Sequence, residues 1–272
     1  MSDTPKSKPM RSHGRVAVRP TLHPRDLMAS SPQLQGVWTA KIITLFPQAF
    51  PGVLGESLTG KGLKDGLWDL ESIDLRRFGE GKHRNVDDTP AGGGAGMVLR
   101  PDVLGNALDM ASAGTPLDRA RWPVVYMSPR GRRFDQAMAR QFAAAEGMTI
   151  LCGRFEGVDE RVLEEYAIQE VSLGDFVLTG GEIAAQALLD ATVRLIPGML
   201  GNSDSIEEES FSQGLLEHPQ YTRPAEWRGR GIPEVLTSGH HGKVEEWRRE
   251  MSEKITRERR PDLWKKHLAD KG

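Results

Sequence analysis

Three glycine-containing segments are the part of this sequence best suited to bind a small molecule. They are Val124–Pro129, Thr149–Gly157 and Val171–Glu182, and in each a short β-prone run meets a Gly or Pro loop. Such runs are typical of buried parallel strands. In parallel sheets, ligands bind where the carboxyl ends of the strands open into loops. Because these loops are rich in glycine and poor in charge, we expect a cofactor pocket built mainly from backbone groups.

Two charged features further along the chain could take part in chemistry. Arg194 interrupts the otherwise apolar helical pattern 191–196, and Glu207, Glu208 and Glu209 follow within a polar segment. Burying an unpaired arginine is costly, so we expect Arg194 at a helix edge or in a functional cleft. An acidic run in a linker is more often simply solvated, so composition alone assigns these glutamates no role.

The elements that must position these residues alternate between strand and helix. Apolar β-prone runs predict strands at 37–46, 124–128 and 149–152. Periodic apolar residues predict helices at 101–111, 134–142 and 183–196. Residues 63–75 form a further element that is either a helix or a strand. This alternation predicts an α/β fold with a mainly parallel sheet.

Changes in composition divide the chain into four parts. Residues 1–36 are rich in Pro, Ser and Arg without periodicity, which predicts a disordered tail; a transit segment or a true start at Met28 are alternatives. The polar stretch 200–212 predicts a flexible linker. We therefore expect an α/β domain at 37–199 and a small helical domain at 213–272. In the latter, apolar residues recur at helical spacing: Val244, Trp247, Met251 and Ile255.

Charge and cysteine content narrow the classes of protein. The net charge of −2 neither predicts nor excludes a polyanionic partner, but residues 241–272 carry ten Lys/Arg against seven acids. Trp227–Arg230 and Tyr221–Arg223 place aromatic rings beside arginines, a pattern that suits nucleic acid, although a solvated surface is the alternative. The single cysteine, Cys152, fits a buried thiol in a reducing cytoplasm. No apolar run reaches the roughly 20 residues of a membrane span.

Three motif-like segments fall short of the sites they resemble. Gly55–Gly62 lacks the hydroxyl residue that closes a phosphate-binding loop, and Gly92–Gly96 lacks dinucleotide-site spacing. His240–His241 has no third ligand at useful spacing, so no metal site is assigned. A P-loop NTPase acting through Lys61 remains an alternative function. An RNA-binding module without enzymatic activity is another.

Ordered motifs along most of the chain carry a more specific signal. They are Ile43–Pro47, His83–Asp88, Gly92–Met97, Ser128–Gly131, Cys152–Gly157, Asp159–Arg161, Gly174–Glu182, Ile196–Gly198 and His218–Pro224. Together they resemble the bacterial tRNA (guanine-N1)-methyltransferase family, TrmD, from about Lys41 to the C-terminal helices. The resemblance implies a homodimer whose N-terminal domain is a SPOUT methyltransferase domain with a trefoil knot between about Tyr126 and Ile183.

The resemblance also implies the cofactor and its pocket. Members of the family hold S-adenosylmethionine in a bent conformation, bound largely by main-chain groups, and they use magnesium. Transferred onto this chain, the cofactor-binding residues are Tyr126, Ser128, Pro129, Gly153, Glu156, Leu173, Gly174, Asp175, Phe176, Val177, Leu178, Gly180 and Gly181. This set coincides with the backbone-built pocket expected from the glycine loops.

The implied reaction is methylation of guanosine 37, 3′ of the anticodon, in tRNA with guanosine at positions 36 and 37. Guanine N1 carries a proton at neutral pH, so a carboxylate base and an arginine near O6 would activate it. We assign these roles to Glu209 and Arg194. The family pattern is usually Glu-Asp-Ser-Phe, whereas this chain has Glu208-Glu-Ser-Phe211, so the carboxylate of Glu209 is one C–C bond further from the backbone.

Overall fold

The computed structural model describes residues 36–200, 210–211 and 214–271. The predicted tail, apart from Gly36, and most of the predicted linker lie outside these ranges. Within the described ranges, no helix has the length and apolar character needed to cross a membrane.

A five-stranded sheet forms the centre of the N-terminal part. Its strands are β1 (Trp38–Thr44), β2 (Trp68–Asp74), β5 (Val124–Arg133), β6 (Gly147–Leu151) and β7 (Gln169–Ser172). They are ordered β2-β1-β6-β5-β7, and every neighbouring pair is parallel. All residues of β1 are buried, as expected for a strand covered on both faces. The predicted α/β class with a parallel sheet is confirmed.

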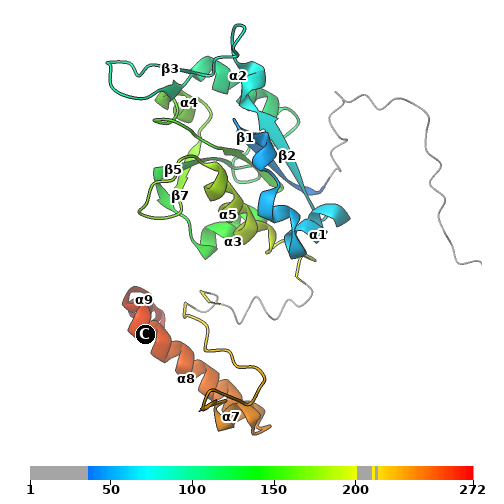
Figure 1. Cartoon of the computed structure of the whole chain (residues 1–272), viewed down its shortest axis with the longest axis vertical. Helices are drawn as coiled ribbons and strands as arrows, with labels where there is room; N and C mark the ends of the chain where they lie inside the picture. The colour runs from blue at the N-terminus through cyan, green and yellow to red at the C-terminus, as the bar shows by residue number, and fades with distance from the viewer. Residues whose placement is uncertain (1–35, 201–209, 212–213, 272) are drawn as a thin grey trace, which may run out of the picture. The chain divides into compact units, whose positions relative to one another are not determined.

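Helices cover both faces of this sheet (Figure 1). They are α1 (Ser57–Asp65), α2 (Pro101–Ser112), α3 (Gln136–Ala143), α4 (Glu160–Glu165) and α5 (Glu182–Val193), with short 3-10 turns at Pro47–Ala49, Gly52–Gly55 and Leu75–Phe78. Buried residues of α3 and α5 belong to one apolar cluster, and those of α2 and α4 belong to another. Successive β1 residues alternate between the clusters because strand side chains alternate between faces.

The segment that resembles a phosphate-binding loop is helical instead. Lys61 lies in the middle of α1, and residues 63–75 comprise the end of that helix followed by β2. A Cβ on Gly60 would collide with the Gly55 carbonyl, so Gly60 allows close packing of the backbone. A helix interior has no row of free N–H groups to hold phosphate, and the P-loop alternative is therefore wrong.

The glycine run before α2 connects two short antiparallel strands, β3 (Asp87–Asp88) and β4 (Val98–Leu99). Gly92, Gly93, Gly94 and Gly96 all have positive φ, a backbone conformation that disfavours other residues. The run is thus a hairpin loop of defined conformation.

The C-terminal described segment contains a small hairpin and three helices. The hairpin pairs β8 (Glu226–Trp227) with β9 (Arg230–Gly231), and the helices are α7 (Glu234–Thr237), α8 (His241–Arg259) and α9 (Pro261–Lys271). The predicted helical pattern around Trp247 and the start of a last helix at Pro261 are confirmed. The hairpin was not predicted from the sequence.

Candidate active site

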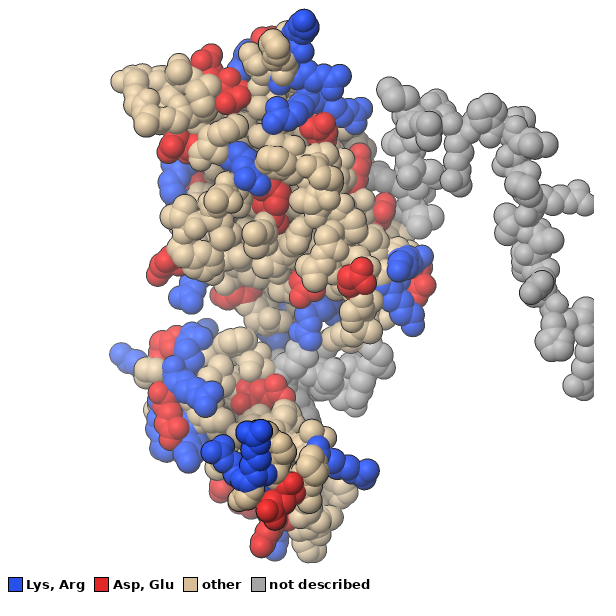
Figure 2. Space-filling view, viewed as in Figure 1, with Lys and Arg blue, Asp and Glu red and all other residues tan. Residues whose placement is uncertain are grey.

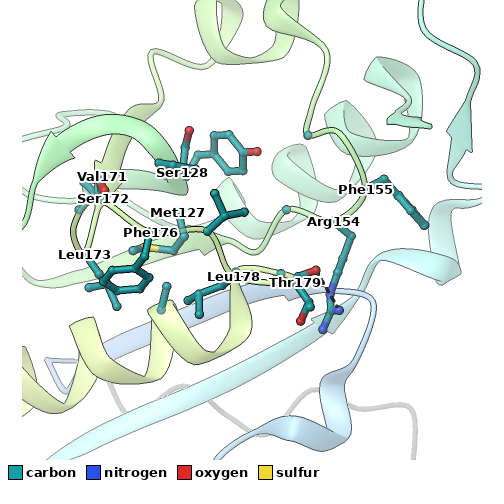
Figure 3. Close-up of a pocket in the computed structure, with 18 of the residues that line it drawn as sticks. Met127, Ser128, Arg154, Phe155, Val171, Ser172, Leu173, Phe176, Leu178 and Thr179 are labelled. Carbon is teal, nitrogen blue, oxygen red and sulfur yellow. Dashed lines mark hydrogen bonds between the residues drawn. The ribbon is translucent and has the colours of Figure 1, made fainter. Parts of the chain in front are cut away.

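A cavity of about 280 Å³ opens at the carboxyl ends of β5, β6 and β7 (Figure 3). Its walls come from residues 126–129, 153–157, 171–174 and 176–181, together with Ala184 of α5. Of the cofactor-binding residues expected from the resemblance, only Asp175 does not line the cavity. Those that do line it are Tyr126, Ser128, Pro129, Gly153, Glu156, Leu173, Gly174, Phe176, Val177, Leu178, Gly180 and Gly181. Three loops far apart in the chain therefore form one cavity, as the glycine pattern predicted.

Close backbone packing explains why these loops contain glycine. A Cβ on Gly153 would lie 2.5 Å from the ring of Tyr126, and one on Gly181 would lie 2.8 Å from Cα of Cys152. The Gly181 N–H donates a hydrogen bond to the Gly153 carbonyl (3.0 Å), which joins the second loop to the third. Any larger residue at Gly181 would push these loops apart.

The first loop packs against β7 with similar closeness. Met127 and Arg132 of β5 both pair with Val171, so residues 128–131 leave the ladder and return to it. A Cβ on Gly131 would collide with the backbone of Glu170 and Val171. The chain that leads into the third loop is thus held tightly by the first.

A partly buried ion pair connects the second loop to helix α5. Arg154 donates to Glu182 through Nε (3.1 Å) and Nη2 (2.9 Å), and through Nη1 to the Thr179 carbonyl (3.2 Å). Thr44, at the end of β1, donates from Oγ1 to the other Glu182 oxygen (2.7 Å). The Arg154 guanidinium lies over the Phe46 ring, 4.4 Å from its centroid.

Arg154 and Glu182 occur within the sequence motifs given above, but the sequence predicted no role for them. Arg154 lines the cavity, as do Met127, Phe155, Gly157, Val171, Ser172, Thr179 and Ala184, which the expected set also omits. The available signal was a glutamate in the first turn of an apolar helix, where burial requires a partner. Figure 3 shows the Arg154 side chain extending toward Thr179, while Phe155 points away from both.

Burial raises the pKa of two groups close to the contact between the second and third loops, the Tyr126 hydroxyl and the Cys152 thiol. Desolvation raises the pKa of the Tyr126 hydroxyl, with the carboxylate of Glu170 adding to the shift. Burial also raises the pKa of the Cys152 thiol well above its usual range, and the nearby Glu182 carboxylate contributes. Both groups therefore stay protonated at neutral pH, and Cys152 is the inert thiol that the sequence predicted.

The glycine loop of the β3–β4 hairpin contacts the cavity wall. The Glu156 N–H donates to the Met97 carbonyl (2.9 Å), and a Cβ on Gly96 would collide with the Glu156 side chain. The hairpin loop therefore lies beside a residue that lines the cavity, which is consistent with a loop that approaches a bound ligand or substrate.

Two expected site residues, Asp175 and Arg194, do not lie at this cavity, and a third is outside the described residues. Asp175 is exposed in the third loop and does not line it. Arg194 is half-buried and caps the C-terminal end of α5, whereas Glu182 begins that helix at the cavity side. At 1.5 Å per residue, these two ends are about 18 Å apart. Glu209 lies outside the described residues, so its role as the base stays a prediction.

In the C-terminal segment, the β8–β9 hairpin presents an aromatic ring and a cation to solvent. The Trp227 side chain is 58% exposed, and the Arg228 guanidinium lies 4.8 Å from the centroid of its ring. Basic and acidic side chains are interleaved over α8 and α9 (Figure 2). His240 and His241 are exposed at the start of α8, and no group of three His, Cys, Asp or Glu suited to a metal occurs in the described ranges.

The fold and the cavity define an α/β protein with a small-molecule site at the carboxyl edge of a parallel sheet. Residues 39–266 match the family model described as tRNA (Guanine-1)-methyltransferase TrmD, and the chain belongs to this family. Family membership implies a knotted SPOUT fold, and the close contacts between the three loops are compatible with it. The family and enzyme class expected from the sequence motifs are confirmed.

Curated relatives agree with this assignment over nearly their whole length. A tRNA (guanine-N(1)-)-methyltransferase of Ruegeria pomeroyi is 74% identical over 90% of this chain and 99% of its own. Enzymes of the same name from Cereibacter sphaeroides and Rhodospirillum rubrum are 70% and 57% identical. These cover 88% and 85% of this chain, and 96% and 94% of their own.

Proposed function

We propose that this protein transfers the methyl group of S-adenosylmethionine to N1 of guanosine 37 in tRNA. The observation that carries the proposal is the cavity, which gathers nearly all the expected cofactor-binding residues in a chain of this family. Its volume of about 280 Å³ is near the lower end of the range for small-molecule sites, which suits a cofactor folded compactly.

The walls of the cavity offer the contacts that this cofactor requires. Met127, Leu173, Leu178 and Ala184 provide apolar surface for the adenine ring. The loops that line the cavity are rich in glycine, so we expect their backbone N–H and C=O groups to form hydrogen bonds with the ring edge. Such backbone contacts hold the methyl group in a fixed orientation, and orientation supplies much of the rate gain in a methyl transfer.

The reacting guanine needs a base and a stabiliser of negative charge. Removal of the N1 proton by the Glu209 carboxylate would make N1 nucleophilic, and Arg194 near O6 would stabilise the charge that develops. N1 then attacks the methyl carbon as the bond to sulfur breaks, which leaves S-adenosylhomocysteine. We assign no step to magnesium, whose ligands are not identified among the described residues.

A homodimer would explain how Arg194 can act in catalysis although it lies at the end of α5 away from the cavity of its own chain. Arg194 is about 18 Å along the helix from the residues at its own cavity, so it is better placed to serve a second copy. Phe176, Val177 and Ile183 are exposed beside the cavity, at 54%, 82% and 65%. Exposed apolar residues of this size favour burial against another chain. Light scattering coupled to size-exclusion chromatography measures the mass in solution; a monomer would remove this explanation.

Methyl transfer to matched transcripts tests the function. The protein is incubated with S-adenosylmethionine labelled in the methyl group and a tRNA transcript that carries guanosine at 36 and 37. We expect label on this tRNA and none when guanosine 37 is replaced by adenosine. Equal label on both transcripts, or none on either, would reject the proposal. An RNA-binding module without activity would bind the transcript and transfer nothing.

A further inference from the structure

The Arg154–Glu182 ion pair is placed to control the charge of the cavity as well as its shape. Arg154 lines the cavity and Glu182 does not, so the carboxylate acts on a ligand only through the arginine or through space. The Glu182 side chain is 6% exposed and that of Arg154 is 25% exposed. A pair this sheltered from water is screened weakly, and removal of one partner leaves the other charge uncompensated.

The same pair also holds the third loop in place. Arg154 Nη1 donates to the Thr179 carbonyl, and a Cβ on the next residue, Gly180, would collide with the Arg154 side chain. Thr44 fixes the second oxygen of Glu182 (2.7 Å), so the carboxylate has a defined orientation. The end of β1, the second loop and the third loop are therefore linked through a single buried carboxylate.

The substrate and product of the proposed reaction differ in charge. S-adenosylmethionine carries a positive sulfonium, whereas S-adenosylhomocysteine has a neutral thioether and is otherwise the same molecule without the methyl group. An uncompensated guanidinium at the cavity wall would repel the first and leave the second nearly unaffected. A guanidinium whose charge is neutralised by a carboxylate would affect the affinities for the two ligands almost equally.

We propose that Glu182 is a positioning and specificity-determining residue that neutralises Arg154, so that the cavity accepts the cationic cofactor as readily as its neutral product. The inference rests on the proposed function. It assigns to the Glu182 carboxylate a role in preventing the product from outcompeting the cofactor. Loop geometry and charge balance are both set by this residue, and they can be separated by experiment.

The test is the ratio of two dissociation constants, for S-adenosylmethionine over S-adenosylhomocysteine, measured by calorimetry on the full chain. Glu182→Gln keeps the shape and removes the charge. For a charge within about 10 Å of the ligand at a partly exposed site, we expect the ratio to rise about three- to tenfold. An equal loss of affinity for both ligands would reduce Glu182 to a structural residue and overturn the proposal.

Three variants act as controls. Glu71→Gln makes the same substitution in another ion pair, with the buried Lys41, away from the cavity lining, and should leave the ratio unchanged. Thr44→Val removes a hydrogen bond to Glu182 without changing any charge, so both affinities should move together. The double variant R154Q/E182Q restores neutrality, and its ratio should return to within about twofold of the wild-type value. A ratio that stays raised in the double variant would contradict the charge mechanism.

Two outcomes keep this test separate from that of the function. A wild-type protein that binds neither ligand would reject the proposed cofactor, whereas binding of both with an unchanged ratio in E182Q would reject only the role of Glu182. If E182Q does not fold, Arg154→Gln gives the converse measurement at pH 8.5. There the remaining carboxylate should lower the ratio, and an unchanged ratio would overturn the proposal.

Discussion

The cavity region and the C-terminal segment differ in how deeply their residues are buried. Around the cavity, two large buried clusters support loops whose backbones are in contact, so packing within the protein defines the shape of the cavity. Among the described residues from 210 to 271, only Leu215 and Thr256 are buried. In that segment, charged side chains and aromatic rings are exposed on short strands and helices that bury few residues. A small cofactor is suited to a preformed pocket, and a long polyanion is suited to an exposed surface.

The largest expected effect separates chemistry from cofactor binding. Glu209→Gln should cut turnover by about 10²–10⁴-fold, because the N1 proton then has no base. Affinity for S-adenosylmethionine should stay within about twofold, since the proposed base acts on the guanine and not on the cofactor. Glu208→Gln serves as the matched control and should remain active. Unchanged turnover in the Glu209 variant would place the base elsewhere.

The two ends of α5 can be separated in mixed dimers. Arg194→Ala should lower turnover by about 10²–10³-fold through loss of charge stabilisation at O6. Gly181→Val should abolish cofactor binding, because its side chain would enter the Cys152 backbone. If each cavity uses the arginine of the other chain, subunits exchanged between these variants regain activity. A mixture no more active than either variant alone would contradict a shared site.

Stability should reveal which glycines are needed for packing. Gly181→Ala is expected to lower the free energy of unfolding by about 1–3 kcal/mol, since the added methyl group meets backbone that cannot yield. Gly242→Ala, in α8 with nothing within 4 Å, should be neutral or slightly stabilising. Denaturant unfolding measures both. Equal stability of the two variants would mean that the loops are looser than described.

Removal of the exposed Trp227 indole should weaken the binding of tRNA without changing the binding of the cofactor. Trp227→Ala should raise the KM for tRNA roughly tenfold if the ring stacks on a base, and leave cofactor affinity unchanged. Trp227→Phe keeps an aromatic face and should recover most of the loss. An equal KM for all three proteins would exclude this hairpin from the RNA surface.

The smallest effect concerns a surface carboxylate at the start of α9. Hydrogen bonding from Arg260 lowers the pKa of Asp262 from its ordinary value of 3.8 to about 2. The carboxylate therefore favours the folded state above pH 4, and this contribution disappears as the pH falls through 2. Because the pair is exposed, Asp262→Asn should lower Tm only slightly at pH 7, and the difference should vanish near pH 2. A difference that persists at pH 2 would contradict this assignment.

The contrast between the regions also explains what could be predicted from the sequence. Four of the five central strands and the cavity were predictable because apolar runs and glycines are direct consequences of burial and close packing, as at Gly153 and Gly181, whereas the sequence did not distinguish a helix from a strand at β2. The Arg154–Glu182 pair was missed because its partners are 28 residues apart and meet only where the second and third loops pack together. The hairpin at Trp227 was missed because two-residue strands have no periodicity.

The identity of the methylated nucleoside tests the central claim most directly. After reaction with methyl-labelled S-adenosylmethionine, the tRNA with guanosine at 36 and 37 is digested to nucleosides and separated by chromatography with mass detection. We predict that the label is found in 1-methylguanosine and that it disappears when position 37 is adenosine. Label in another nucleoside, or in 1-methylguanosine from the adenosine-37 transcript, would contradict the account.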